Sequence, residues 1–60
     1  MLGGRVKAGS MVVWTLRNGS EVICTVVYTR DNRVYRLTVE DGNGQRHNIG
    51  RHSLKRYRDR

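Results

Sequence analysis

Basic side chains are concentrated in the last fifteen residues of this 60-residue chain, where Tyr57 lies among them. The candidates for contacts with a polyanion are Arg46, Arg51, His52, Lys55, Arg56, Tyr57 and Arg58. Guanidinium groups bind phosphate through paired hydrogen bonds, and an aromatic ring beside them stacks on a base. This pattern predicts a nucleic-acid-binding surface on which the cations contact phosphates while Tyr57 and His52 contact bases.

The whole chain is strongly basic, which favours the same class of partner. It carries 12 Lys and Arg against 5 Asp and Glu, a formal net charge of +7. Ten of the 12 cations are arginines, and residues 46–60 carry six cations against one acidic residue, a net +5. A surface that only keeps a protein in solution needs neither a large excess of positive over negative charge nor a preference for arginine over lysine. Besides nucleic acid, an acidic protein is a partner that fits this charge.

Cys24, His47 and His52 are the residues that suggest a metal site or a catalytic thiol. One Cys and two His are fewer than the four ligands of a structural zinc site. Cys24 lies within an apolar run, where a thiol serves as a small hydrophobic side chain. We therefore expect Cys24 in the core, no metal, no cofactor and no enzymatic activity.

The length limits the architecture to one domain. A chain of this size buries only about 60% of the surface that its unfolded form exposes. Cys24 is the only cysteine, so no internal disulfide can form. No apolar run approaches the roughly 18 residues of a membrane span, and no signal peptide is recognisable. We expect a cytoplasmic protein that does not bind membranes and that gains stability as a homo-oligomer or on a partner.

Turn signals divide the chain into short strands. Asn18-Gly19 is typical of a two-residue hairpin turn, and residues 41–44 (Asp-Gly-Asn-Gly) form a second turn signal. Alternation and β-branched residues predict strands at 11–17, 21–29, 34–40, 45–49 and 54–57, and helical periodicity is absent. The prediction is an all-β fold, a small five-stranded antiparallel barrel of the SH3-like or Sm-like kind. Residues 1–10 would form a flexible N-terminal arm, and residues 11–60 the barrel domain.

The aromatic residues allow two interpretations. The complete set is Trp14, Tyr28, Tyr35 and Tyr57, with no Phe. In one interpretation Trp14 and Tyr35 fill the core while Tyr28 and Tyr57 cap its ends. In the other, tyrosine rings stay exposed to stack on bases. The core interpretation is favoured for Trp14, and both stay open for Tyr57.

Several of these motifs resemble the Sm-like proteins. Residues 14–19 (Trp-Thr-Leu-Arg-Asn-Gly), the apolar run 22–27 and Asp31-Asn32 are similar to the first Sm motif. Arg51-His52-Ser53-Leu54 resembles the Lys-His signature of the bacterial Sm-like RNA chaperone family Hfq. The resemblance implies a ring-forming barrel in which Arg51 and His52 contact RNA and Asp31-Asn32 lie near the base-binding loop. Cys24 replaces the usual glycine of the second strand, and residues 1–10 offer no counterpart of the N-terminal helix.

Two further resemblances imply other ligands. Leu16, Asn18-Gly19, Tyr35, Leu37, Val39-Glu40 and residues 42–46 form a pattern similar to the Sm-like Rho inhibitor family Rof, which binds a protein. Residues 54–58 (Leu-Lys-Arg-Tyr-Arg) resemble the end of the SH3-like DNA-binding domains of integrases. We therefore predict a non-enzymatic nucleic-acid-binding barrel, with RNA or single strands favoured. The alternatives are a protein-interaction module, an adaptor or inhibitor of a larger nucleic-acid or transcription enzyme, and an SH3-like domain that binds duplex DNA.

Overall fold

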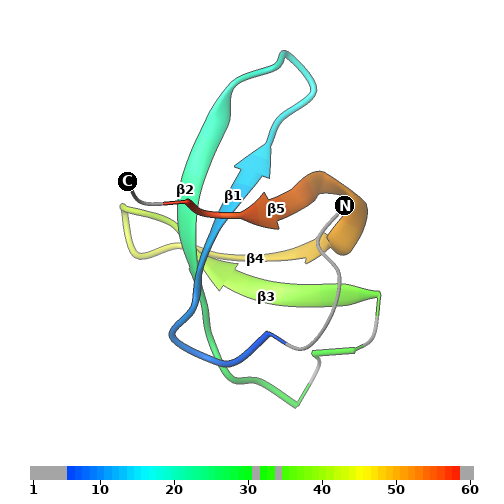
Figure 1. Cartoon of the computed structure of the whole chain (residues 1–60). Coiled ribbons are helices and arrows are strands. Elements are labelled where there is room, and N and C mark those ends of the chain that lie inside the picture. The colour runs from blue at the N-terminus through cyan, green and yellow to red at the C-terminus, as the bar shows by residue number, and fades with distance from the viewer. Residues whose placement is uncertain (1–5, 31, 34, 59–60) are drawn as a thin grey trace.

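Five antiparallel strands form one sheet, in which the last strand pairs with the first. The computed structural model describes residues 6–30, 32–33 and 35–58. Its elements are β1 (Met11–Thr15), β2 (Glu21–Val26), β3 (Arg36–Glu40), β4 (Arg46–Gly50), the 3₁₀ helix η1 (Arg51–Ser53) and β5 (Leu54–Arg56). The strand order across the sheet is β4-β3-β2-β1-β5 (Figure 1). The predicted all-β class and its five antiparallel strands are confirmed.

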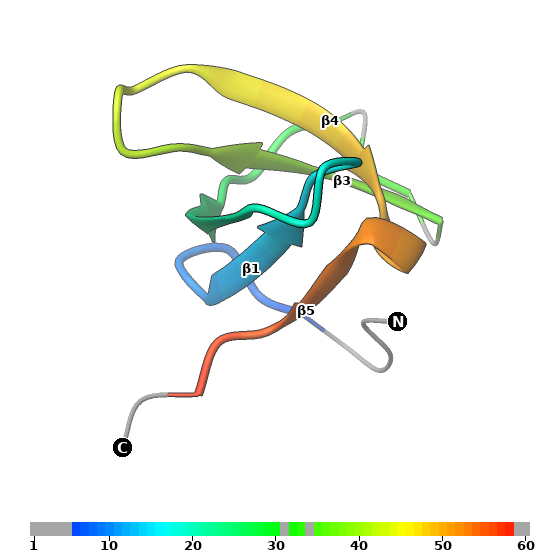
Figure 2. The same ribbon diagram turned by 90° about the horizontal axis from the view of Figure 1, so that it is seen from above.

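The sheet bends so that it has a concave and a convex side. Viewed from above, β3 and β4 lie along one side of the molecule, and β1 and β5 lie along the other (Figure 2). β4 and β5 occupy the two ends of the strand order, so the sheet is barrel-like but is not closed by hydrogen bonds. Within the described ranges, no helix has the length and apolar character needed to cross a membrane.

Apolar side chains on the concave side form the core. Its buried members are Val12, Cys24, Val26, Leu37, Val39 and Leu54. The strand register brings them together, because Val12 lies opposite Cys24 and Val26 lies opposite Val39. Directly opposed residues of antiparallel strands share one face of the sheet. The expectation that Cys24 is a core residue is confirmed, since only 1% of it is exposed.

The chain turns at both predicted places, but the first turn is not of the predicted two-residue type. The Leu16 amide donates to the carbonyl oxygen of Ser20 at 2.8 Å, which leaves a three-residue loop, 17–19, and Asn18 does not have a positive φ. In the β1–β2 turn, Gly19 has a φ of 88°, and its amide donates to the carbonyl oxygen of Leu16 at 3.0 Å. In the β3–β4 turn, Gly44 has a φ of 80°. A side chain is strained at such positive φ values, so glycine suits both positions. Each hairpin register therefore follows from local sequence.

The connection between β2 and β3 is longer than the sequence predicts. β2 ends at Val26 and β3 begins at Arg36, three and two residues inside the predicted strands. Tyr35 therefore precedes the sheet and is 81% exposed, so its assignment to the core is wrong. The alternation that places Leu37 and Val39 inside does not extend back to Tyr35, because the chain has left the sheet there.

The second half of the expected N-terminal arm lies against β2. The Gly9 amide donates to the carbonyl oxygen of Val26 at 2.7 Å, and the Val26 amide donates to that of Ser10 at 2.9 Å. Val6 packs against the core. Residues 1–5, the other half of the arm, lie outside the described residues.

Candidate functional site

The seven residues predicted to bind nucleic acid lie in three parts of the chain. These are the start of β4 (Arg46), η1 (Arg51 and His52), and β5 with the residues that follow it (Lys55, Arg56, Tyr57 and Arg58). Arg46 begins β4 and Arg51 follows its last residue, a separation of about 16 Å along an extended strand. Lys55 points to the convex side, where its Nζ lies 2.6 Å from Oε2 of Glu21. Arg56 ends β5 opposite Val12. Tyr57 and Arg58 follow β5, with Tyr57 half-buried and Arg58 exposed.

Arg51 and His52 both belong to η1. The Arg51 amide donates to the carbonyl oxygen of Tyr35 at 2.9 Å, which ties η1 to the β2–β3 connection. The His52 ring covers Gly50, where an added Cβ would lie 2.6 Å from the ring carbon Cε1. Gly50 thus leaves room for the His52 ring beside the end of β4.

Arg51 lines a pocket at the end of the barrel where the N-terminal arm, the β2–β3 connection and η1 meet. The pocket has a volume of about 480 Å³. Its buried lining includes Val26 and Leu37 of the core. Its exposed lining includes Tyr28, Arg30 and Arg33. The fold therefore places one of the predicted cations beside three residues that sequence reasoning missed.

The pocket combines cations with an aromatic ring. Three of its lining residues are arginines, and none of the lining residues that the structure describes is acidic. The Tyr28 side chain is 80% exposed. The missed signal is the sequence of residues 28–36, which holds two tyrosines and three arginines. The strand pattern divides this segment between two strands and a polar turn. The Sm-like resemblance singled out only Asp31-Asn32 there; Asn32 lines the pocket, and Asp31 lies outside the described residues.

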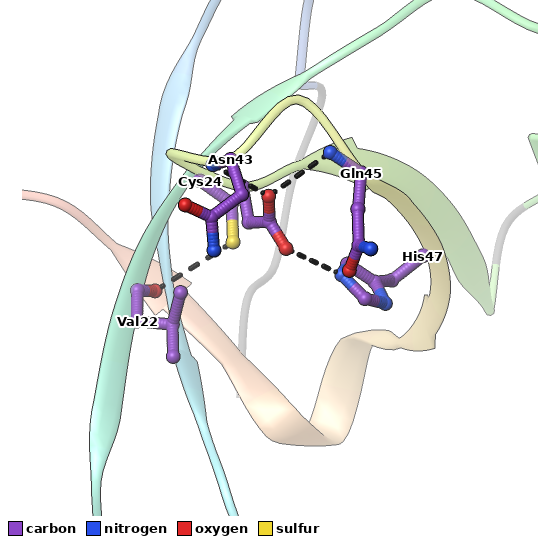
Figure 3. A network of polar contacts seen from close by, with 6 residues as sticks. Val22, Cys24, Asn43, Gln45 and His47 are labelled. Carbon is purple, nitrogen blue, oxygen red and sulfur yellow. Dashed lines mark hydrogen bonds and ion pairs between the residues drawn. The ribbon is translucent and has the colours of Figure 1, made fainter.

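A second polar cluster surrounds Asp41 in the β3–β4 turn. One carboxylate oxygen, Oδ1, accepts the backbone amides of Asn43 at 2.8 Å and Gln45 at 3.0 Å. The other, Oδ2, accepts the Nε2–H of His47 at 2.8 Å (Figure 3). The hydrogen bond from His47, followed by those from the turn amides, holds the pKa of Asp41 below its usual value. The carboxylate therefore fastens the turn to β4.

The contacts of this cluster extend to the core. The His47 ring lies 4.9 Å from the Trp14 ring, so β4 contacts β1 across the concave side. Burial, with a smaller contribution from the Asp41 charge, raises the pKa of the Cys24 thiol. A protonated thiol is a poor nucleophile. Among the residues with described positions, no group of three or more His, Cys, Asp and Glu side chains could hold a metal ion.

The Asp41 cluster predicts a dependence of stability on acid. Because the folded-state pKa of Asp41 is lowered, its stabilisation is present above the unfolded aspartate pKa of about 3.9 and is lost as the pH falls below that value. We expect the urea midpoint of the wild-type protein to fall between about pH 5 and pH 3. Asp41→Asn removes this titration, and its midpoint should decline less over the same range. Equal declines in the two proteins would contradict the assignment.

Comparison with known proteins adds no relative. The chain matches no protein-family model, no curated protein and no solved structure. Its function must therefore be inferred from its own residues. The features available are a net charge of +7 and an arginine-lined pocket at one end of a five-stranded, barrel-like sheet.

Proposed function

We propose that this protein is a non-enzymatic nucleic-acid-binding domain with an SH3-like or Sm-like architecture. RNA or another single strand would bind at the pocket beside Arg51. One observation carries the proposal: Arg30, Arg33 and Arg51 line the same 480 Å³ pocket as the exposed Tyr28. Cations for phosphate and a ring for a base thus meet in one place.

Arginine suits this pocket because its donors match the geometry of a phosphate. Each guanidinium can donate two parallel hydrogen bonds to phosphate oxygens, whereas a lysine acts as a point charge. Arg30 and Arg33 are exposed and belong to the same short connection, so they can contact one backbone segment. Residues outside the pocket remain candidates for contacts further along a bound strand: Arg46, His52, Lys55, Arg56, Tyr57 and Arg58.

The shape of the site favours a single strand over a duplex. A base can enter a pocket or stack on Tyr28 only when it is unpaired, because duplex bases are stacked inside the helix. A pocket of several hundred cubic ångströms is in the range that proteins use for small ligands. Its volume of about 480 Å³ therefore suits one nucleotide of a strand.

Titration of the protein with single-stranded RNA, single-stranded DNA and duplex DNA of equal length tests the proposal. Three neutralised phosphates on a single strand predict a slope of log K against log salt of about −2, a 15- to 20-fold loss of affinity between about 50 and 200 mM. A higher affinity for duplex DNA would favour the SH3-like duplex-binding alternative. Affinity that is at background for all three polymers, or that ignores salt, would refute the proposal.

A second candidate function is a protein-interaction module. Met11 and Ile23 are 48% and 49% exposed on the convex side, and β4 and β5 are edge strands with one neighbour each. Exposed strand edges can pair with another chain, including a second copy of the same protein. Recovery of one stoichiometric acidic protein after nuclease treatment would favour this candidate. Light scattering at micromolar concentration tests the proposed homo-oligomer.

A further inference from the structure

A chain of hydrogen bonds runs from the β2–β3 connection to β4 on the convex side of the sheet. The Oδ1 of Asn32 accepts the hydroxyl of Thr29 at 3.0 Å, and the hydroxyls of Thr29 and Thr38 lie 3.2 Å apart. The Nδ2 of Asn48 in turn donates to the Thr38 hydroxyl at 3.3 Å. Thr38, only 8% exposed, is thus the buried polar link between the connection and the sheet.

The chemistry of the groups gives this chain one direction. An amide oxygen can only accept, so the single Thr29 hydrogen goes to Asn32. The Thr38 hydroxyl must then be the donor to Thr29, while it accepts from Asn48. Each hydroxyl donates once and accepts once within the chain. Removal of either hydroxyl breaks this chain, but a direct bond from the Thr38 backbone amide to the Asn32 side chain remains.

The side-chain oxygen of Asn32 has no lone pair left for a ligand. Besides the Thr29 hydroxyl, its Oδ1 accepts the backbone amide of Thr38 at 2.8 Å, and its Nδ2 donates to the carbonyl oxygen of Val27 at 2.9 Å. An asparagine that reads adenine uses the oxygen and the nitrogen of its amide together. In this structure the Asn32 oxygen is occupied by the protein itself.

Two of the three arginines of the pocket lie close to Asn32 in the chain. Arg30 precedes Asn32 by two residues, Arg33 follows it directly, and both line the same pocket. The Asn32 backbone amide donates to the carbonyl oxygen of Thr29 at 3.3 Å, and the Arg33 backbone amide donates to that of Arg36 at 2.9 Å. These two backbone hydrogen bonds hold the main chain next to Arg30 and at Arg33.

We propose that Asn32 is a positioning residue, which holds Arg30 and Arg33 at the pocket through its side-chain bonds to Thr29, Thr38 and Val27 and does not itself read a base. This inference rests on the proposed function, because it concerns how that site binds phosphate. An anchored connection keeps the two arginines oriented before the ligand arrives, so less conformational entropy is lost on binding. A loosened connection should weaken phosphate binding specifically.

The test uses Asn32→Ala, which removes the side-chain bonds to Thr29, Thr38 and Val27 together. With the single strand that binds the wild-type protein best, we expect Asn32→Ala to lose about tenfold in affinity and to flatten the salt slope by about 0.7 to 1.4. Thr38→Val removes only the hydroxyl link and leaves the bond from the Thr38 backbone amide to Asn32, so it should lose less affinity. Thr38→Ser should bind within about twofold of the wild-type protein.

A double-mutant cycle separates a positioning role from base reading. In an Arg30→Gln/Arg33→Gln background, Asn32→Ala should cost no further affinity, since it acts through arginines that are already gone. A wild-type salt slope in folded Asn32→Ala, or a further loss of affinity in that background, would overturn the inference and leave the proposed function intact. Should Asn32→Ala not fold, Thr29→Val against Thr29→Ser removes one of the three Asn32 bonds and should flatten the salt slope by a smaller amount. If the wild-type protein itself binds no single strand, the proposed function fails and the inference fails with it.

Discussion

Arg30→Gln/Arg33→Gln should lower affinity for single-stranded nucleic acid by about 100-fold at low salt, because each charged hydrogen bond to phosphate contributes about 1.5–3 kcal/mol. Both side chains line the pocket. The salt slope should fall by about 1.4, that is, by about 0.7 for each phosphate that the variant no longer neutralises. Fluorescence anisotropy of a labelled oligonucleotide at several salt concentrations measures both quantities in one series.

Arg17→Gln is the matched control for the single variant Arg33→Gln. Arg17 lies in the β1–β2 turn, which stands at the opposite end of β2 from the β2–β3 connection (Figure 1). Six residues of extended strand span about 20 Å, twice the Debye length of about 10 Å at 0.1 M salt. Arg33→Gln should cost about tenfold and Arg17→Gln less than about twofold. Equal losses would mean that net charge alone governs binding.

Leu54→Ala should unfold a large fraction of the protein. Leu54 is 2% exposed, lies opposite Trp14 in the β1–β5 pair, and anchors a strand of only three residues. Truncation of a buried leucine costs about 2–5 kcal/mol. A domain of this length has a total stability of only about 3–9 kcal/mol. Urea unfolding followed by Trp14 fluorescence and far-ultraviolet circular dichroism measures the loss.

Ile23→Ala provides the comparison for that prediction. Ile23 lies on the convex side of β2 and is 49% exposed, so its truncation leaves no buried cavity. Its cost should stay below about 1 kcal/mol. A Leu54→Ala protein as stable as Ile23→Ala would contradict the docking of β5 on the core, and with it the placement of η1 and Arg51 beside the pocket.

Sequence reasoning was most successful where structure depends on neighbouring residues. The chain turns at Asn18-Gly19 and at residues 41–44, because Gly19 and Gly44 take positive φ values that other residues rarely adopt, although the first turn has three loop residues rather than the predicted two. The position of Cys24 within an apolar run identified it as a core residue. The number of strands and their antiparallel class followed from these local signals.

The pocket could not be assembled from sequence, because its residues are distant along the chain. Val6, Arg30 and Arg51 meet only when the N-terminal arm pairs with β2 and η1 bonds to the connection that precedes β3. The same folding separates Arg46 from Arg51, although both fall in the C-terminal basic segment. Adjacent residues of a strand point to opposite sides, so Lys55 meets Glu21 on the convex side while Leu54 enters the core.

The positions of the turns, the number of strands and the basic character of the chain follow from the sequence, since these depend on local conformational preference and on composition. The folded chain is needed to show which cations share a surface, that Tyr35 lies outside the core, and that the Asn32 side-chain amide is occupied by Thr29, Thr38 and Val27. The physical reason is that strand pairing and loop closure bring together side chains whose separation in the chain carries no signal of their proximity.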